Sequence, residues 1–450
     1  MKRISITGAA ILCCVLFSSA AYPAAPAPPA YPALPAPPAR ESQVTFEEAA
    51  RDLTSADSGT RLRAVRMLEE AAYPEAAVPL APLVTDAVDE VQLQAIAAEL
   101  NIFLAEKIVP RKRLGLVIEV RNPIAAAAAF SAGPLALGSL PVPAEVLTAL
   151  RAGARDENPR VALEALYAFG TLAVEPIGSA RRELLRASGP DLASMLGAQD
   201  PALRFTAVRV LGRVFEHRPD DPPVDQLVGD AVITTLNDAD RTVRVASMQT
   251  LGAMRYERAV QGLTDLFQHF GKGELAEASL DAIAHIGHPS SSPLLSSQLT
   301  NKSAAIRGIA MEGLGRTGDR IKAGEIDAAL KNERTEAVKL AGSFAAVLLT
   351  RAPITPIGDA LTNARLHDQA RRYLLELARG RTTMFTRYVQ DPDEQVRIDV
   401  VDILGLSGDP AALPMLDPLA RDANPQVAGA AARAIARLRR AQGRPVSDVD

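Results

Sequence analysis

The segment Asp240–Ala253 reads DRTVRVASMQTLGA, and its pattern returns in Ala304–Arg316 (AAIRGIAMEGLGR) and Asp393–Leu406 (DEQVRIDVVDILGL). Each copy has an apolar residue, then a basic one, then small residues, and finally a Leu-Gly pair eight and nine positions after the first apolar residue. Apolar positions that recur on one side of a helical turn predict an amphipathic helix. The three segments therefore predict one kind of helix that the chain uses repeatedly.

The ends of these predicted helices carry their own signals. An Asp or Asn precedes the first turn and is often followed by Pro, which is a common way to begin a helix; examples are 158–159, 200–201 and 424–425. Shorter apolar segments lie between the copies, such as 293–299 and 413–419, and predict a second helix in each unit. Glycine is expected to end the long helix in a left-handed conformation, and the glycines concerned are Gly170, Gly212, Gly252, Gly287, Gly315 and Gly405.

The pattern has a regular period. When the first apolar position of each copy is taken as an anchor, the anchors are about 33 residues apart on average, and a period between 20 and 50 predicts a solenoid. A single helix pair cannot bury both of its apolar faces, so it stacks on its neighbours. The anchors are Leu62, Val91, Ala125, Val161, Leu203, Val243, Leu275, Ile306, Val338, Leu366, Val396 and Val427.

This pattern resembles the HEAT-repeat family, in particular the short bacterial repeats called PBS-lyase-like. The resemblance covers residues 44–440 and implies an all-α fold, a right-handed α-solenoid of about twelve HEAT-like helix pairs. Residues 101–142 depart from the pattern and are interpreted as a degenerate repeat. A membrane hairpin is the alternative there, but Glu119, Arg121, Gly133 and Pro134 interrupt every apolar run of the required length of about 20 residues.

The first 43 residues differ from the rest in composition. Residues 1–21 have a basic start, a 14-residue apolar stretch and small residues after it, which is typical of a secretory signal peptide. Residues 22–43 are rich in Pro and Ala and predict an extended linker, and 441–450 form a polar tail. We therefore expect an exported protein of the periplasm or the extracellular cell envelope; an uncleaved membrane anchor is the alternative, and the mature chain is expected to have no transmembrane span.

Composition and motifs argue against several functions. The chain of 450 residues has a formal net charge of −4, so it lacks the basic footprint of a nucleic-acid binder. No catalytic residue, cofactor or metal ligand is predicted. Known nucleophile and phosphate-binding motifs are absent from the sequence, as is the His-Glu pair that HEAT-type hydroxylases use to bind iron. His285 and His288, three residues apart, remain as an alternative metal or cofactor site.

Two sets of side chains are candidates for binding. A basic residue follows the anchor in six copies, and it either grips an acidic ligand or pairs with the neighbouring capping turn; these are Arg63, Arg204, Arg244, Arg307, Lys339 and Arg397. The second set lies six positions after the anchor and is expected to face the concave side, where its mixed charge suits a protein or peptide. Its members are Arg209, Gln249, Asp281, Glu312, Phe344, Arg372, Asp402 and Arg433.

The sequence therefore predicts a non-enzymatic scaffold that binds a protein or peptide partner along its concave face. Two alternatives stay open. One is a HEAT-type enzyme or a cofactor- or metal-binding protein, and the other is a purely structural stalk that uses the Pro-rich linker.

Overall fold

A computed structural model describes residues 45–104, 142–172, 185–218 and 221–441. All of these belong to one compact unit that begins at Thr45. The predicted signal peptide and linker lie outside the described residues, as does residue 442 onward of the predicted tail. Most of the predicted degenerate repeat is also outside them; its first residues, 101–103, are the last turn of a regular helix.

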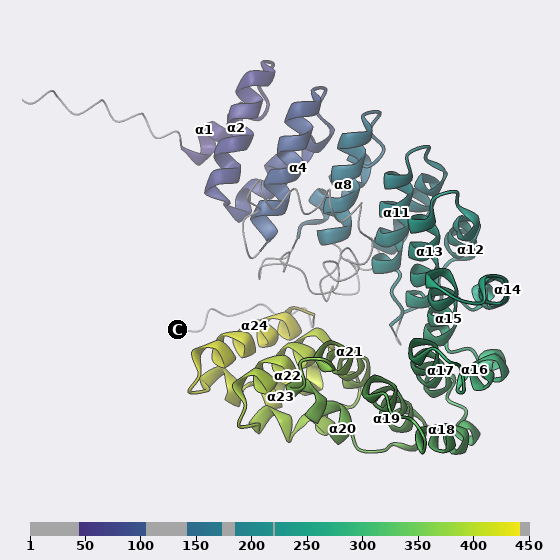
Figure 1. The fold of residues 1–450 in the computed structure, drawn as a ribbon. Helices are drawn as coiled ribbons and strands as arrows, with labels where there is room; N and C mark the ends of the chain where they lie inside the picture. The colour runs from purple at the N-terminus through teal and green to yellow at the C-terminus, as the bar shows by residue number, and fades with distance from the viewer. Residues whose placement is uncertain (1–44, 105–141, 173–184, 219–220, 442–450) are drawn as a thin grey trace, which may run out of the picture. The chain divides into compact units, whose positions relative to one another are not determined.

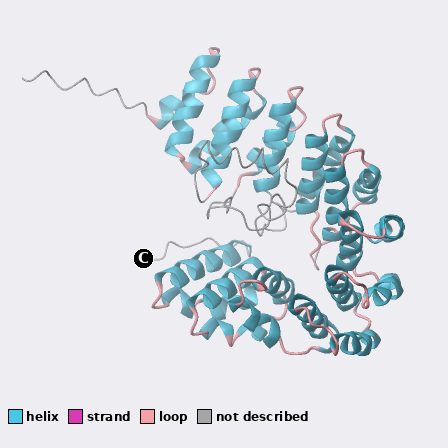
Figure 2. Cartoon of the chain, in the orientation of Figure 1, coloured by secondary structure: helices cyan, strands magenta, loops and turns pink. Residues whose placement is uncertain are grey.

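All the regular elements in the described residues are helices (Figure 2). The longer ones have 12 to 17 residues and form one layer, in which each packs against the next along the chain (Figure 1). We call this the long-helix layer. Its members are α2 (Ser58–Ala71), α4 (Asp89–Phe103), α8 (Pro159–Leu172), α11 (Pro201–Val214), α13 (Arg241–Ala253), α15 (Glu274–Ile286), α17 (Ala304–Thr317), α19 (Glu336–Thr350), α21 (His367–Ala378), α22 (Glu394–Leu406) and α24 (Pro425–Ala441).

Shorter helices cover the other side of the long-helix layer and form a short-helix layer. Several of them begin or continue as a 3-10 turn, and Pro often occupies the first positions, where a helix needs no backbone donor. Its α-helical members are α1 (Phe46–Asp52), α3 (Ala77–Leu80), α7 (Ala144–Gly153), α10 (Gly189–Ser194), α12 (Gln226–Thr234), α14 (Val260–Phe270), α16 (Ser292–Gln298), α18 (Ala323–Leu330), α20 (Thr355–Gly358) and α23 (Leu413–Leu416).

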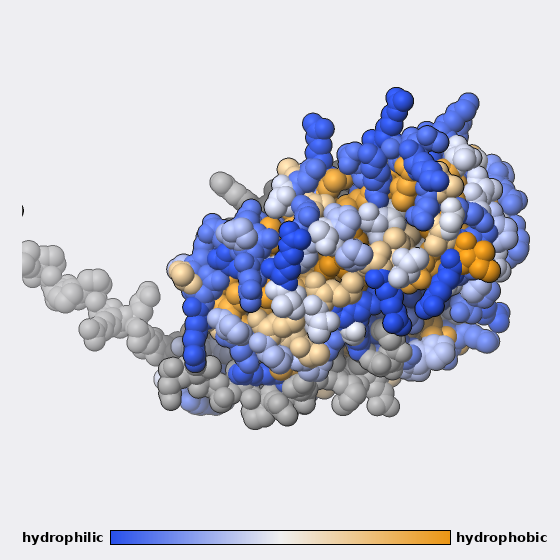
Figure 3. All heavy atoms as spheres, turned by 90° about the horizontal axis from the view of Figure 1, so that it is seen from below, coloured by the Kyte–Doolittle hydropathy of each residue, from blue (hydrophilic) through white to orange (hydrophobic). Residues whose placement is uncertain are grey.

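The core is a series of thin apolar layers between successive helix pairs. Anchor residues such as Val91, Val161 and Val243 are buried, and Leu251 of the Leu-Gly pair is fully buried. Charged and polar side chains cover most of the face in Figure 3, where apolar side chains form small separate groups. The predicted all-α solenoid is confirmed.

The prediction that six glycines end the long helices is wrong for all of them except Gly287. Gly287 ends α15 with a φ of 65°, whereas Gly170, Gly212, Gly252, Gly315 and Gly405 lie inside their helices. There they allow neighbouring helices to approach: a Cβ atom on Gly315 would lie 2.7 Å from the Ala345 Cα atom. These glycines therefore make room for the next repeat.

Candidate functional site

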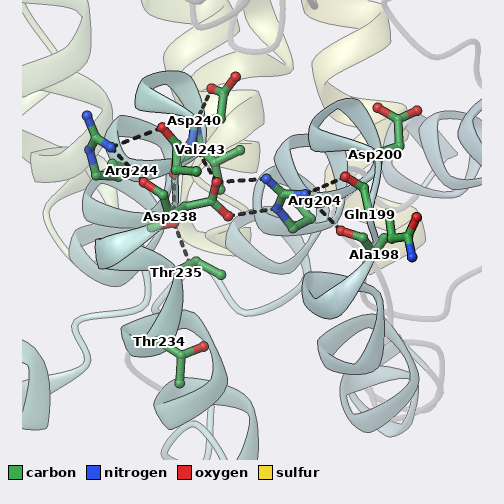
Figure 4. Close-up of polar contacts among 12 residues, drawn as sticks. Ala198, Gln199, Asp200, Arg204, Thr234, Thr235, Asp238, Asp240, Val243 and Arg244 are labelled. Carbon is green, nitrogen blue, oxygen red and sulfur yellow. Dashed lines mark hydrogen bonds and ion pairs between the residues drawn. The ribbon is translucent and has the colours of Figure 1, made fainter.

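The capping turns of the long helices are joined by a ladder of arginines. In a complete rung, the arginine four residues after the helix N-cap donates from Nη1 to carbonyls just before its own helix. Its Nε and Nη2 atoms hold a carboxylate two residues before the next N-cap, as Arg204 holds Asp238 at 2.7 and 2.8 Å (Figure 4). The complete rungs are Arg61–Asp86, Arg204–Asp238, Arg307–Glu333 and Arg397–Asp422.

Each rung carboxylate also caps the helix that follows it. An oxygen of Asp238 accepts the backbone N–H of Asp240 at 2.8 Å, and an oxygen of Glu333 accepts that of Thr335 at 2.8 Å. The hydrogen bonds from Arg307 outweigh the effect of burial and lower the pKa of Glu333 to about 2. The arginine column thus fixes the stacking of the repeats, which is the second of the two interpretations offered by the sequence.

The first rung corrects the predicted register. Arg61, and not Arg63, holds Asp86, because α2 begins after the N-cap Asp57, two residues earlier than the anchor at Leu62 implies. Lys339 forms no rung with a following capping turn among the described residues; its ammonium lies 2.9 Å from Glu336 on its own helix.

The structure divides the predicted concave row. Arg209 donates to Gln249 at 3.0 Å, Asp281 lies 3.4 Å from His285 in the same helix, and Glu312 belongs to a buried cluster described below. Arg372 and Arg433 are exposed, and Asp402 is half-buried. Phe344 is fully buried, so its predicted role as a partner contact is wrong.

The eight residues also fail to form one structural column. Six of them lie nine residues after the N-cap of their helix, but Asp281 and Arg372 lie eight and six residues after theirs. The shifts arise because α15 begins after Gly273 and α21 after Leu366, so the anchor falls at a different point of these two helices than in the other six.

A cluster around Arg316 fills the centre of the long-helix layer. The Arg316 side chain is 4 % exposed, and its Nε and Nη2 atoms lie 2.9 to 3.2 Å from the carboxylate of Glu376, which belongs to α21. Its Nη1 atom donates to Glu312, one turn earlier in α17, at 3.2 Å. Glu312 also accepts the hydroxyl of Tyr373. We call these residues, with Phe344, Arg255, Asp281 and His285, the Arg316 cluster.

Two aromatic rings pack against the charged groups of the cluster. Tyr373 stacks on Phe344 with ring centroids 4.4 Å apart, and the Arg316 guanidinium lies 5.1 Å from the Phe344 ring centre. Phe344, which the sequence assigned to a partner surface, is therefore the apolar platform on which the charged groups rest. Burial and the neighbouring Glu312 both raise the pKa of Tyr373, so it remains a neutral hydrogen-bond donor.

One contact of the cluster shows that the face is concave here. Arg255, just after α13, lies 3.2 Å from Glu376 of α21, although α15, α17 and α19 intervene in the layer. Such a contact is possible only if the layer bends toward this face. The long-helix layer is therefore concave on the side that carries the Arg316 cluster.

The positive and negative charges of the cluster are similar in number, but the ion pairs are not one to one. Two arginines, Arg255 and Arg316, contact the single carboxylate of Glu376. Burial is the largest single influence on the pKa of Glu376 and raises it, but Arg316, His285 and Arg255 together lower it further, so that carboxyl stays ionised with a lowered pKa. Burial and the positive charge of Arg316 together lower the pKa of Arg255, despite the attraction of Glu376. Arg255 is thus the least neutralised cation of the cluster.

Arginines predominate farther along the same face. Arg371, Arg433 and Arg437 surround Asp402, whose pKa is nevertheless raised because burial outweighs their attraction. Arg372 of α21 and Arg433 of α24 make no hydrogen bond to another residue in the described part of the chain. This end of the long-helix layer therefore presents exposed positive charge.

His285 and His288 do not form a metal site in the described part of the chain. His285 bonds the carbonyl of Asp281 through Nδ1, and His288 accepts the backbone N–H of Ser290. No group of three or more His, Cys, Asp or Glu side chains among residues 45–104, 142–172, 185–218 and 221–441 is arranged to hold a metal ion. Within the same residues, none of the helices combines the length and apolar character needed to cross a bilayer.

The fold defines the described chain as an α-solenoid, and a family model matches two parts of it. Residues 189–273 and 383–446 match the HEAT-repeat family, which confirms the resemblance read from the sequence. No curated protein matches the chain.

Three solved structures illustrate the similarity in fold. An engineered protein is 17% identical over 88% of this chain and 98% of its own, with a TM-score of 0.42. A structure from a study of the phosphorylation switch between cadherin and β-catenin is 12% identical over 88% of this chain and 91% of its own, with a TM-score of 0.41. A computationally designed armadillo repeat protein for modular peptide recognition is 17% identical over 60% of this chain and 99% of its own, with a TM-score of 0.35.

Sequence reasoning missed the main residues of the cluster. Arg316 follows a Leu-Gly pair and resembles an ordinary basic residue at a helix end, and Glu376 and Tyr373 lie in a repeat with a weak pattern. The contacts of Arg316 and Arg255 with Glu376 join residues 60 and 121 positions apart. Only the curvature of the stack brings these residues together.

Proposed function

We propose that the protein is an exported, non-enzymatic scaffold that binds a polypeptide on the concave side of its long-helix layer. The observation that carries the proposal is the Arg255–Glu376 contact, because it marks a concave, rigidly tied surface in the middle of that layer. A preformed surface loses little conformational freedom when a partner binds. Export rests on the sequence of residues 1–21 alone.

Charge suggests where the partner lies. The exposed Arg433 lies near the half-buried Asp402, and the exposed Arg372 directly follows Arg371, which also lies near Asp402, so this end of the face suits an acidic segment of the partner. Complementary charge at an interface raises the rate of association and selects among partners. Glu312 and Phe344, by contrast, stabilise the surface from within and do not contact the partner directly.

The test is affinity capture from the native cell envelope with Arg372→Glu/Arg433→Glu. The expected result is that a polypeptide captured by the wild type is lost by at least about tenfold in the variant, since each reversed charge turns attraction into repulsion. Arg320→Glu/Lys331→Glu is the matched control, because it reverses two exposed charges in the short-helix layer around α18. Equal capture by both double variants would contradict the proposal.

A further inference from the structure

One rung of the arginine ladder lacks its acid. Arg244 is held as in the other rungs, with Nη1 donating to the carbonyls of Asp238 at 2.6 Å and Ala239 at 3.3 Å (Figure 4). The residue two positions before the next N-cap is Gly271, so this rung has no carboxylate at that position. The Arg244 Nε atom is buried and has no hydrogen-bond partner in the structure.

The four complete rungs show what normally occupies this position. In each of them the Nε and Nη2 atoms of the arginine bind one carboxylate, with distances of 2.7 to 3.1 Å. The same carboxylate accepts the N–H of the N-cap residue. Here the N-cap is Gly273, which has no side chain to cap α15. The unused donors are therefore those that converge on a carboxylate elsewhere in the ladder.

The segment just before α15 is exposed to solvent. A Cβ atom on Gly271 or Gly273 would meet no atom within 4 Å, and Gly271, Lys272 and Gly273 are all exposed. The nearby Glu274 does not fill the position, because its carboxylate lies 2.6 Å from Arg241. Both glycines have positive φ angles, 66° and 84°, and glycine changes such angles at little cost. A carboxylate from outside reaches the shielded Nε atom only when this segment shifts, and the two glycines permit such a change.

We propose that Arg244, with the backbone N–H of Gly273, binds a carboxylate supplied from outside the chain. Its source is either an Asp or Glu side chain of a bound polypeptide or a small carboxylic acid. A carboxylate fits because a planar guanidinium held in this pose binds two carboxylate oxygens at once. The site lies at the N-terminal ends of the long helices, away from the Arg316 cluster. This proposal therefore does not depend on the proposed function.

The test uses the full chain labelled with ¹⁵N-arginine and follows the Nε–Hε signals by NMR. The signal absent from Arg244→Lys identifies Arg244. The probes are acetyl-Gly-Gly-Asp-Gly-Gly-amide, the same peptide with Asn in place of Asp, and sodium acetate with sodium chloride as its control. We expect the Asp peptide to move the Arg244 signal downfield with a Kd on the order of millimolar, the range of a single charged contact.

The source follows from the comparison of probes. A Kd for acetate as low as that for the Asp peptide would indicate a small carboxylic acid, and a lower Kd for the peptide would indicate a polypeptide. The proposal is overturned if neither probe moves the signal, or if the Asn peptide moves it as far as the Asp peptide does.

Two variants locate the site. Gly271→Asp places an acid two residues before the N-cap, although the φ of 66° strains a side chain there, and its Arg244 signal should no longer respond to the Asp peptide. Gly262→Asp adds the same charge to α14, where a side chain would meet no atom within 4 Å, and should respond like the wild type. A response that persists in Gly271→Asp would place binding elsewhere and contradict the proposal.

Discussion

The two ends of the long helices are held together by different kinds of contact. At the N-terminal ends, the arginine ladder repeats one local arrangement, and its ion pairs join residues 25 to 34 positions apart. Toward the C-terminal ends, the Arg316 cluster occurs once and joins residues up to 121 positions apart. The ladder sets how each repeat stacks on the next, and the cluster holds the bend that several repeats produce together.

We expect a substitution in the Arg316 cluster to lower the free energy of unfolding more than a substitution in any single rung. Arg316→Leu leaves the carboxylates of Glu312 and Glu376 close together without their cation, and we expect a loss of about 2–3 kcal/mol in the free energy of unfolding. Denaturant titration followed by circular dichroism measures it. Arg316→Leu/Glu376→Leu should recover part of this loss, because it removes one of the two unpaired carboxylates. An Arg316→Leu variant as stable as the wild type would show that Arg316 does not stabilise the cluster.

Rungs should differ according to whether their acid is present. Arg204→Gln breaks a bidentate pair and leaves the largely buried Asp238 unpaired, at an expected cost of about 2 kcal/mol. Arg244→Gln removes only the hydrogen bonds to carbonyls and should cost about 1 kcal/mol or less. Thermal unfolding of the two variants side by side checks this. Equal losses would mean that the carboxylate adds nothing to a rung.

Two glycines of α17 separate helix propensity from packing between repeats. Gly308→Ala should stabilise the protein by about 0.5–1 kcal/mol, because a Cβ atom there would meet nothing within 4 Å and Ala favours the helix. Gly315→Ala should destabilise it by about 1–2 kcal/mol, because its Cβ would press against the backbone of Ala345. Melting temperatures that rise in both variants would contradict the role assigned to the Leu-Gly glycines.

The smallest expected effect is a pH dependence specific to the cluster. Burial disfavours the charged form of His285, but the attraction of Asp281 prevails over it and over the repulsion of Arg316, so the pKa of His285 is raised. A raised pKa stabilises the folded state below the ordinary value of about 6.5, and that stabilisation is lost as the pH rises through the folded-state pKa. Melting curves of wild type and His285→Gln between pH 5 and about 9 should therefore converge at the alkaline end. Parallel curves throughout would contradict this linkage.

The comparison also explains how far the sequence could predict the structure. Solenoid architecture, N-caps such as Asp240 and the pairing of the arginine column follow from residues that recur at a fixed period, because each rung depends on one helix pair and its neighbour. The Leu-Gly glycines were misinterpreted because a glycine near a helix end fits both a C-cap and a close helix contact. Arg255, Arg316 and Glu376 could not be paired from the sequence, because their contact depends on the summed rotation of four repeats.

Site-specific photocrosslinking shows whether a polypeptide binds the concave side of the long-helix layer. The photoreactive residue p-benzoylphenylalanine would replace Arg433 on that layer or, as a control, Ile321 in the short-helix layer, whose side chain is highly exposed. We expect position 433 to crosslink to a discrete polypeptide in the native cell envelope and position 321 to give no such crosslink. Crosslinks to the same polypeptide from position 321, with none from position 433, would contradict this expectation.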